Sequence, residues 1–381
     1  MIKSIVFFAN AYPYSFSNAG VFIQQIVFAF ADKGIKCIVI VPASITNAII
    51  RKRRIRPKYE IQVSPNGSSV EIISPYYISF SSKKIGFINT ERLNLFFFKA
   101  ACIKVFDRLN LIPDLLYGHF IGLAGISSAI IGEKYGIKSI IGYGEGQFDA
   151  LKYYPLNKLR AWLRNVSLFV PNSSPGLQTL LKYNIATEDN TLCLPNSVNT
   201  KLFCIGDKKK AREKLQIPID DFIVLFVGSF IETKGPLRVE KATQGIEGVK
   251  CIYLGEGPQR PSSDNIFFIG SVPHDKIPIY MQAADIFVLP TTREGCCNAI
   301  IEATCCGLPI ISSNQAFNDA IIFNDNSIRI NPLDVSEIRE AILFFKNDKS
   351  RLVTYSAASA SHRNQFEIEE RINKILSLLS G

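Results

Sequence analysis

The same order of elements opens both halves of this 381-residue chain. An apolar, strand-like run leads through a loop to a segment of helical periodicity and then to a second apolar run. These segments are SIVFFAN, VFIQQIVFAFADK and KCIVIVP in the first half, and FIVLFVGS, PLRVEKATQGI and KCIYLGEG in the second. Continuous apolar strands that alternate with helices are typical of parallel sheets covered on both faces. The pattern therefore predicts an α/β chain with two Rossmann-like halves.

The junction between the halves is predicted in the segment LCLPNSVNTKLF, where Pro195 and Asn196 interrupt the periodicity. The length of the chain agrees with two domains, because a single hydrophobic core stops growing at about 250–300 residues. We expect an N-terminal domain over residues 1–198 and a C-terminal domain over residues 199–363. The remaining residues, 364–381, predict a helix that can pack back on the N-terminal domain.

Capping residues indicate where two of the helices begin and end. Ser17 or Asn18 is a suitable N-cap for the first helix, and Gly34 suits the left-handed position that ends it. In the second half, Asn298 is expected to cap a helix that ends at Gly307. Both helices would thus begin at loops that follow a strand, which is where parallel sheets bind ligands.

Basic residues are concentrated in the first half of the chain. Residues 1–190 hold 22 Lys and Arg against 11 Asp and Glu, an excess of +11 in a chain whose net charge is +10. The densest run is RKRRIRPK, from Arg51 to Lys58. It indicates either a solvated loop or a face that meets an anionic membrane surface. Nucleic acid is disfavoured as a partner, because no nucleic-acid-binding motif accompanies the run.

The cysteines and the N-terminal run indicate the compartment. Nine cysteines lack the regular spacing of a small secreted scaffold, which favours a reducing environment. The first apolar run is too short for a signal peptide, and no run of about 18 apolar residues is long enough to cross a bilayer. We therefore expect a cytoplasmic protein that is at most peripheral on the inner face of the plasma membrane.

The stretch TTREGCCNAIIEATCCGLPII, from Thr291 to Ile311, holds two cysteine pairs and two glutamates. A metal or redox site is one interpretation of the cysteines. However, neighbouring residues on a helix point about 100° apart, so Cys305 and Cys306 cannot both face one metal ion. Their spacing also matches no zinc pattern. We interpret these cysteines as small packing residues of a helix that lies on a sheet.

The glutamates of this stretch favour a second interpretation, a site for a sugar nucleotide. The loop and the helix N-terminus follow a buried strand, so backbone N–H groups and the helix dipole can meet a phosphate or diphosphate. Glu294 precedes the helix and Glu302 lies in its first turns, where both carboxylates can accept hydrogen bonds from hydroxyls. A sugar nucleotide supplies a diphosphate and hydroxyls together.

The segment EGCCNAIIEATCCGLPII resembles the EG-x6-EA-x3-G-x-P signature of the large retaining GT-B glycosyltransferase family called family 4, or glycosyl transferases group 1. Other segments are similar to this family in the same order, namely VGSFIETKG, YLGEGP and IFFIGSVPHDKIPIYMQAADIFVLPT, and LPNSVNTKLF resembles its PNG-V-D segment. The resemblance is dense from Phe222 to Ile311 and thin in the first half. It implies the GT-B fold, in which two Rossmann-like domains face a central cleft, with the acceptor held by the first domain and the donor by the second.

The resemblance also implies roles for residues of the second half. Lys234 would neutralise the diphosphate as the sugar departs, Glu294 would bind the hydroxyls of the donor sugar, and Glu302 would bind the ribose. Backbone at four positions would meet the diphosphate: Gly295, Cys296, Cys297 and Asn298. The position that is commonly Arg in the family is Ser229 here, so one cation for the diphosphate is replaced.

The remaining matches to the family are less specific. Gly20 matches a glycine loop that approaches the diphosphate, and a plain helix-entry glycine is the alternative. His119 matches a histidine near the reacting sugar, with a structural histidine as the alternative. His274 matches a common loop position to which we assign no chemistry. Glu145 lies where the segment IIGYGEGQFDA departs from the family pattern, and its role is left open.

Together these features predict a metal-independent, retaining glycosyltransferase. It would move a hexose-type residue from a UDP- or GDP-sugar to a lipid-linked glycan acceptor in surface polysaccharide biosynthesis, without a further cofactor. The chain has no Asp-x-Asp, which disfavours the metal-dependent type of transferase. Two alternatives remain: a GT-B-shaped sugar-nucleotide epimerase, and a non-catalytic partner that binds sugar nucleotide and assists another transferase.

Overall fold

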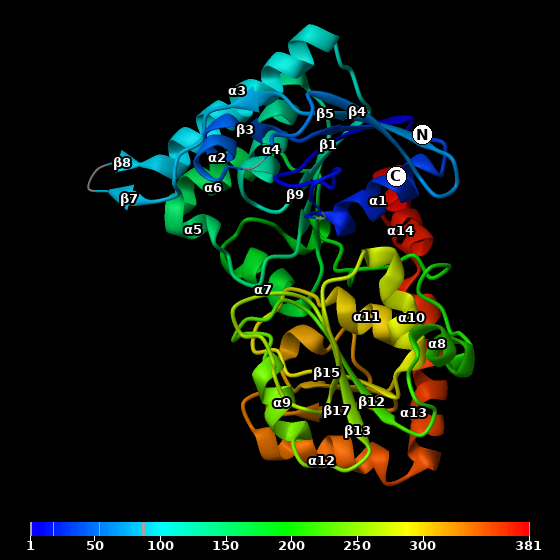
Figure 1. Ribbon diagram of the computed structural model, residues 1–381. Coiled ribbons are helices and arrows are strands. Elements are labelled where there is room, and N and C mark those ends of the chain that lie inside the picture. The colour runs from blue at the N-terminus through cyan, green and yellow to red at the C-terminus, as the bar shows by residue number, and fades with distance from the viewer. Residues whose placement is uncertain (1, 18, 53, 86–87, 381) are drawn as a thin grey trace. The chain divides into compact units, whose positions relative to one another are not determined.

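The chain folds as two compact units (Figure 1). The computed structural model describes residues 2–17, 19–52, 54–85 and 88–380. Unit 1 consists of Met1–Leu194 and Arg371–Gly381, and unit 2 consists of Pro195–Glu370. The chain leaves unit 1 inside the predicted junction segment and returns to it within the last helix, α14 (Ile368–Ser380). The sequence predicts these two domain boundaries after residues 198 and 363.

Unit 1 is built on a seven-stranded sheet with the strand order β11-β10-β9-β1-β2-β5-β4. Its parallel strands are β1 (Ser4–Phe8), β2 (Lys36–Ile40), β5 (Ser69–Ile73), β9 (Leu115–His119), β10 (Ser139–Tyr143) and β11 (Leu168–Pro171), and the edge strand β4 (Tyr59–Val63) is antiparallel to β5. Two short pairs lie outside this sheet, β3 (Ala43–Ser44) with β6 (Tyr76–Tyr77) and β7 (Lys84–Ile85) with β8 (Ile88–Asn89). The helices are α1 (Val21–Ala31), α2 (Ile45–Ile50), α3 (Thr90–Leu109), α4 (Leu123–Tyr135), α5 (Ala150–Tyr153), α6 (Leu156–Leu163) and α7 (Ser174–Lys182).

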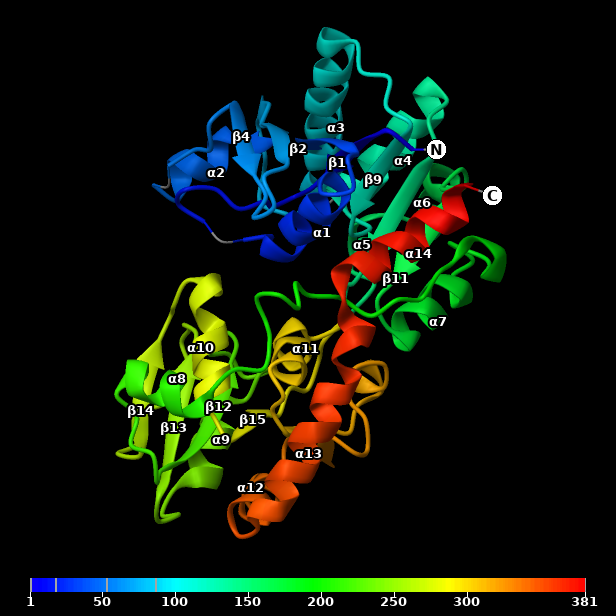
Figure 2. The same ribbon diagram turned by 90° about the vertical axis from the view of Figure 1, so that its right-hand side faces the viewer.

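Two adjacent residues of β1 show that this sheet is covered on both faces. The ring of Phe7 lies 5.7 Å from that of Phe30 on α1, and the ring of Phe8 lies 5.9 Å from that of Phe106 on α3. Successive side chains of a strand point to opposite faces. Consequently α1 and α3 lie on opposite sides of β1 (Figure 2), and the prediction of a doubly covered parallel sheet is confirmed.

Unit 2 is built on a six-stranded parallel sheet with the order β14-β13-β12-β15-β16-β17. The strands are β12 (Phe222–Val227), β13 (Val249–Leu254), β14 (Ile266–Gly270), β15 (Ile286–Leu289), β16 (Ile310–Ser313) and β17 (Ser327–Ile330). The helices are α8 (Lys208–Leu215), α9 (Pro236–Thr243), α10 (Ile277–Ala283), α11 (Asn298–Cys305), α12 (Val335–Lys346) and α13 (Lys349–His362). All residues of β12 and β15 are buried, as continuous apolar strands of a parallel sheet require.

The strand order reverses once in each sheet. In unit 1 the chain moves from β1 to β2 on one side and later places β9 on the other side of β1. In unit 2 it moves from β12 to β13 and later places β15 on the other side of β12. Open α/β sheets bind ligands outside the carboxyl ends of the strands at such switch points. A ligand site is therefore expected at the loops that follow β1, β9, β12 and β15.

The first helix begins differently from the prediction. Its N-cap is Gly20, which forms no side-chain cap, while the hydroxyl of Ser17 accepts a hydrogen bond from the N–H of Ala19 at 3.2 Å. Asn18, the alternative cap, lies outside the described residues. Gly20 has φ +87°, and a Cβ added there would lie 2.5 Å from the carbonyl oxygen of Ala11. Close approach of the loop after β1 thus requires glycine at this helix entry.

The start of α11 also differs from the prediction, whereas its end agrees. The N-cap is Cys297, and Asn298 is the first helical residue, whose Oδ1 accepts a hydrogen bond from Nδ2 of Asn196 at 2.8 Å. The side chain of Asn298 is therefore engaged by another loop and does not cap the helix. Gly307 has φ +80° and donates its N–H to the carbonyl of Thr304, so the predicted glycine stop is confirmed.

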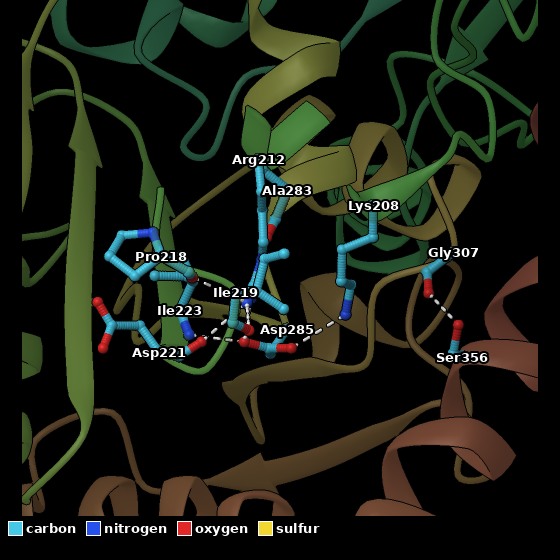
Figure 3. Close-up of polar contacts among 10 residues, drawn as sticks. All are labelled: Lys208, Arg212, Pro218, Ile219, Asp221, Ile223, Ala283, Asp285, Gly307 and Ser356. Atoms are coloured by element: carbon cyan, nitrogen blue, oxygen red, sulfur yellow. Dashed lines mark hydrogen bonds and ion pairs between the residues drawn. The ribbon is translucent and has the colours of Figure 1, made fainter. Parts of the chain in front are cut away.

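A buried ion pair lies at the amino ends of β12 and β15 in unit 2 (Figure 3). Arg212 of α8 is 4% exposed, and its Nη2 donates to Oδ2 of Asp285 at 2.8 Å. Asp285 precedes β15 and also accepts the backbone N–H of Ile223 at 2.6 Å, which joins it to β12. Lys208 approaches the other carboxylate oxygen of Asp285 at 3.0 Å. This network ties a helix to two central strands at the end of the sheet away from the switch-point loops.

Candidate functional site

Two loops meet at the switch point of unit 2, the loop after β12 and the loop after β15. The backbone N–H of Thr292 donates to the carbonyl of Thr233 at 2.8 Å. Beneath them Arg238 of α9, 9% exposed, donates from Nη2 to the carbonyls of Glu232 and Pro290 at 2.9 and 3.0 Å. The guanidinium of Arg238 therefore holds the two loops together. It does not replace the positive charge that is missing at position 229, where the chain has Ser229 and the family commonly has Arg.

Lys234 and Glu294 form an ion pair across these two loops. Their side chains are 20% and 15% exposed, and the hydroxyl of Thr291 donates to Oε1 of Glu294 at 3.2 Å. Burial lowers the pKa of Lys234, but Cys297 and Glu294 raise it, and the net pKa lies above its usual value. The structure thus brings together a persistent cation and a carboxylate that the sequence placed in one site.

Asn196 of the junction segment contacts the loop between Glu294 and α11. The N–H of Asn196 lies 3.3 Å from Sγ of Cys296, and its Nδ2 lies 3.3 Å from the carbonyl of Cys296. Together with the bond to Asn298, these contacts fix the backbone that leads into the helix N-terminus. The segment from Gly295 to Asn298 therefore has a defined course beside Lys234. Asn196 is a positioning residue that the sequence analysis used only as a boundary.

Glu302 of α11 has a partner that the sequence did not reveal. Its Oε1 lies 2.9 Å from Nε2 of His274, which belongs to a short 3-10 turn, His274–Lys276. Burial lowers the pKa of His274, but the hydrogen bond and charge of Glu302 raise it, so the net pKa lies above the usual value. The ring of Phe203 packs 5.1 Å from that of His274. Glu302, 4% exposed, is thus held beside a histidine for which the sequence predicts no chemistry.

In unit 1, His119 ends β9 at the switch point. It is 8% exposed, and burial together with the charge of Arg371 lowers its pKa to about 3, so the imidazole is neutral at physiological pH. Its ring lies 5.1 Å from that of Phe22, in the first turn of α1, next to Gly20. Phe120 follows with φ +67°, an uncommon conformation for a bulky residue. The structure therefore places Gly20 and His119 in one region of unit 1, where strain is also stored.

Glu145, whose role the sequence left open, follows β10 in unit 1. Burial and the charge of Asp149 raise the pKa of Glu145 to about 8, against a weaker opposing effect of the backbone N–H of Ile121. Among the described residues, its Oε2 is buried without a hydrogen-bond partner. This raised pKa favours the protonated carboxyl group, which can donate a hydrogen bond.

The four cysteines of the signature stretch lie in the core of unit 2. Cys296, Cys297, Cys305 and Cys306 are all 9% exposed or less. Burial raises the pKa of Cys297 to about 11 and that of Cys305 to about 12, so these thiols stay protonated. Within the described ranges, no group of three or more His, Cys, Asp or Glu could hold a metal ion, and no helix is long and apolar enough to span a membrane.

The sequence of unit 2 matches a known family. Residues 207–362 match the sequence model described as glycosyl transferases group 1. TuaC of Bacillus subtilis strain 168, a glycosyltransferase assigned to teichuronic acid biosynthesis, is 24% identical over 360 residues, which cover 91% of this chain and 90% of TuaC. A D-inositol 3-phosphate glycosyltransferase of Acidothermus cellulolyticus is 26% identical over 167 residues, 38% of this chain and 37% of that protein.

Solved structures share the fold. Sucrose-phosphate synthase from Thermosynechococcus elongatus has a TM-score of 0.78 and 20% identity over 99% of both chains. HepE of Anabaena, solved with UDP and glucose, has a TM-score of 0.71 and 17% identity over 98% of this chain and 99% of HepE. The fold is therefore that of the GT-B glycosyltransferases, as the resemblance implied. This agrees with the match of residues 207–362 to the sequence model of glycosyl transferases group 1.

Proposed function

We propose that this chain is a metal-independent, retaining glycosyltransferase that moves a hexose-type residue from a UDP- or GDP-sugar to a lipid-linked glycan acceptor. The observation that carries this proposal is the pair of Lys234 and Glu294 at the switch point of unit 2, beside the N-terminus of α11. A cation, a carboxylate and a helix N-terminus suit a diphosphate joined to a sugar. The similarity to TuaC, named for teichuronic acid biosynthesis, supports a role in surface polysaccharide assembly.

The proposed chemistry divides the work between Lys234 and Glu294. An ammonium group has three donors, and Glu294 engages one of them. The others can hold the diphosphate, so that Lys234 stabilises the charge that develops as the bond from sugar to phosphate breaks. Both described contacts of Glu294 go to Oε1, which leaves Oε2 for a hydroxyl of the sugar.

Acceptor attack is proposed to occur on the face that the diphosphate leaves. The acceptor oxygen bonds to the anomeric carbon, the bond from this carbon to the phosphate oxygen breaks, and the acceptor proton passes to the leaving phosphate. The anomeric configuration is then retained. NMR of the product tests this directly, because an inverted anomer would overturn the retaining assignment.

A thermal-shift panel of nucleotide sugars identifies the donor. A ligand that binds only the folded state raises the apparent stability by mass action. We expect a UDP- or GDP-hexose to raise the melting temperature of the wild type and to have a smaller effect on Lys234→Ala. No shift with any member of the panel would count against a donor site in unit 2.

Incubation of the donor without acceptor separates this proposal from the epimerase alternative. A transferase leaves the sugar of the intact donor unchanged, whereas an epimerase converts it to the isomeric sugar nucleotide. Chromatography of the nucleotide fraction distinguishes the two. A non-catalytic partner would bind the donor and release no nucleotide even with a complete set of acceptors.

A further inference from the structure

A pocket of about 290 Å³ lies at the carboxyl ends of β1 and β2 in unit 1. The loop after β1 contributes Asn10 and Tyr12 to its walls, and the segment after β2 contributes Val41 and Ser44. The basic run that begins at Arg51 closes another side. The pocket thus occupies the end of the sheet at which open α/β folds bind ligands. None of the residues assigned above to the proposed transfer chemistry lines it.

The charged side chains among the described lining residues of this pocket are all positive. Three arginines line it, Arg51, Arg54 and Arg56, and no Asp or Glu is among the described lining residues. Arg51 and Arg54 are exposed, and within the described part of the chain neither guanidinium forms an ion pair. Arg54 lies 4.6 Å over the ring of Phe16, which orients its guanidinium. Two planar cations are therefore available to a ligand.

The third arginine builds the wall instead of facing solvent. Arg56 is 5% exposed and donates to the carbonyls of Tyr12 at 2.7 Å and Pro13 at 2.5 Å, so it holds the loop after β1. Glu60, which does not line the pocket, lies 3.5 Å from Nη2 of Arg56. Arg56 thus ties its end of the basic run to the loop after β1, while Arg51 and Arg54 are exposed at the pocket.

Two buried donors of the lining residues have no hydrogen-bond partner among the residues that the structure describes. They are Nε of Arg56 and the hydroxyl of Tyr12, which is 2% exposed. Burial raises the pKa of Tyr12, so its phenol stays protonated. A buried polar group without a partner is costly and calls for an explanation. The exposed Arg51 and Arg54, with no carboxylate among the described lining residues, suit a ligand that only accepts hydrogen bonds, which is an anion.

We propose that Arg51 and Arg54 bind an anionic group of the glycan acceptor, a phosphate or a carboxylate. The proposal rests on the proposed function, in which unit 1 holds the acceptor. Guanidinium groups match both oxyanions with paired hydrogen bonds. The acceptor would then be a charged glycan or a glycan phosphate. The basic run would select this substrate, and it would not act as a general membrane-binding face.

The whole 381-residue chain is tested with two probes, inorganic phosphate and glucuronate, each measured by equilibrium dialysis. In Arg51→Gln/Arg54→Gln, we expect the affinity for the bound probe to fall roughly tenfold or more, because the variant loses the charged hydrogen bonds of both guanidinium groups. The matched control is Lys52→Gln/Lys58→Gln, which removes the same charge from the same run. Lys52 and Lys58 are exposed and do not line the pocket, so this variant should bind the probe like the wild type.

The preference between the probes tells a phosphate group from a carboxylate group. Lys234→Ala separates this site from the donor site, because it should keep the bound probe even if it cannot transfer sugar. Loss of probe binding in Lys234→Ala, or binding of neither probe to the wild type, would overturn the proposal. Equal losses of probe binding in the two double variants would also overturn the proposal. Equal losses of binding to vesicles of equal parts phosphatidylcholine and phosphatidylglycerol would overturn it too, because they would indicate a membrane surface. If the probe binds as expected and no donor is turned over, the proposed function fails while the anion site stands.

Discussion

The two ends of the unit 2 sheet each hold a cation paired with a carboxylate, and they use the pair differently. At the amino ends, all three guanidinium nitrogens of Arg212 donate, to Asp285 and to main-chain carbonyls. At the carboxyl ends, the ammonium of Lys234 meets Glu294 and no other acceptor among the described residues. A saturated pair fixes the fold, whereas a pair with spare donors can also bind a ligand. The number of unused donors therefore separates the structural pair from the pair that we propose to bind the donor.

The largest effect on stability should come from breaking the saturated pair. Asp285→Ala leaves Arg212 buried without its carboxylate, and we expect the free energy of unfolding to fall by about 3–5 kcal/mol. Urea unfolding measures this loss. The control is Lys208→Ala, which removes the partner that is 48% exposed and should cost at most about 1 kcal/mol. Equal losses in the two variants would contradict the distinction between the two ends of the sheet.

Breaking the unsaturated pair should instead remove activity. Lys234→Ala and Glu294→Ala are each expected to lower kcat/KM by about 100- to 1,000-fold, as the loss of a group that stabilises a developing charge does. Urea unfolding should show a smaller loss of stability than in Asp285→Ala, because Lys234 and Glu294 are more exposed than Arg212 and Asp285. Cys305→Ser is the control, because Cys305 packs in the core and faces no ligand in our interpretation. Comparable activity in the three variants would refute this interpretation of the signature stretch.

The smallest effect concerns the pair of His274 and Glu302, which lies at the same end of the sheet. Because Glu302 raises the pKa of His274 above its usual value of about 6.5, the pair stabilises the fold fully below that pH. This contribution is lost as the pH rises through the raised pKa. Glu302→Gln should therefore cost on the order of 1 kcal/mol near pH 6 and less near pH 9. A difference from wild type that does not change with pH would show that the histidine is uncharged in the pair.

Much of the fold could be predicted from the sequence, because its strands and helix ends are indicated by residues that lie close together in the chain. The apolar runs at Ser4–Phe8 and Phe222–Val227 are strands, and Gly307 ends its helix. The caps were harder, since a suitable residue such as Asn298 can be engaged elsewhere, here by Asn196. Composition cannot show such an engagement, because these two residues are 102 positions apart.

The candidate site was predicted in part for the same reason. The motif placed Lys234 and Glu294 in one site, and the structure pairs them although they are 60 positions apart. His274 carried no such signal, because its partner Glu302 is 28 positions away on another element. The charge of the basic run alone predicts either a solvated loop or a face that meets an anionic membrane surface. The place of this run in a pocket depends on the buried Arg56, whose carbonyl partners belong to the loop after β1.

The last helix makes unit 1 discontinuous in the sequence. Arg371 is 6% exposed and donates to the carbonyl of Leu194 at 2.7 Å, and Ile372 and Ile375 are fully buried. A ribosome makes these residues after the whole of unit 2. Unit 1 therefore cannot be completed when its first 194 residues emerge, although domains often fold in order from the N-terminus. During synthesis, unit 1 can complete its packing only after the whole of unit 2 has been made.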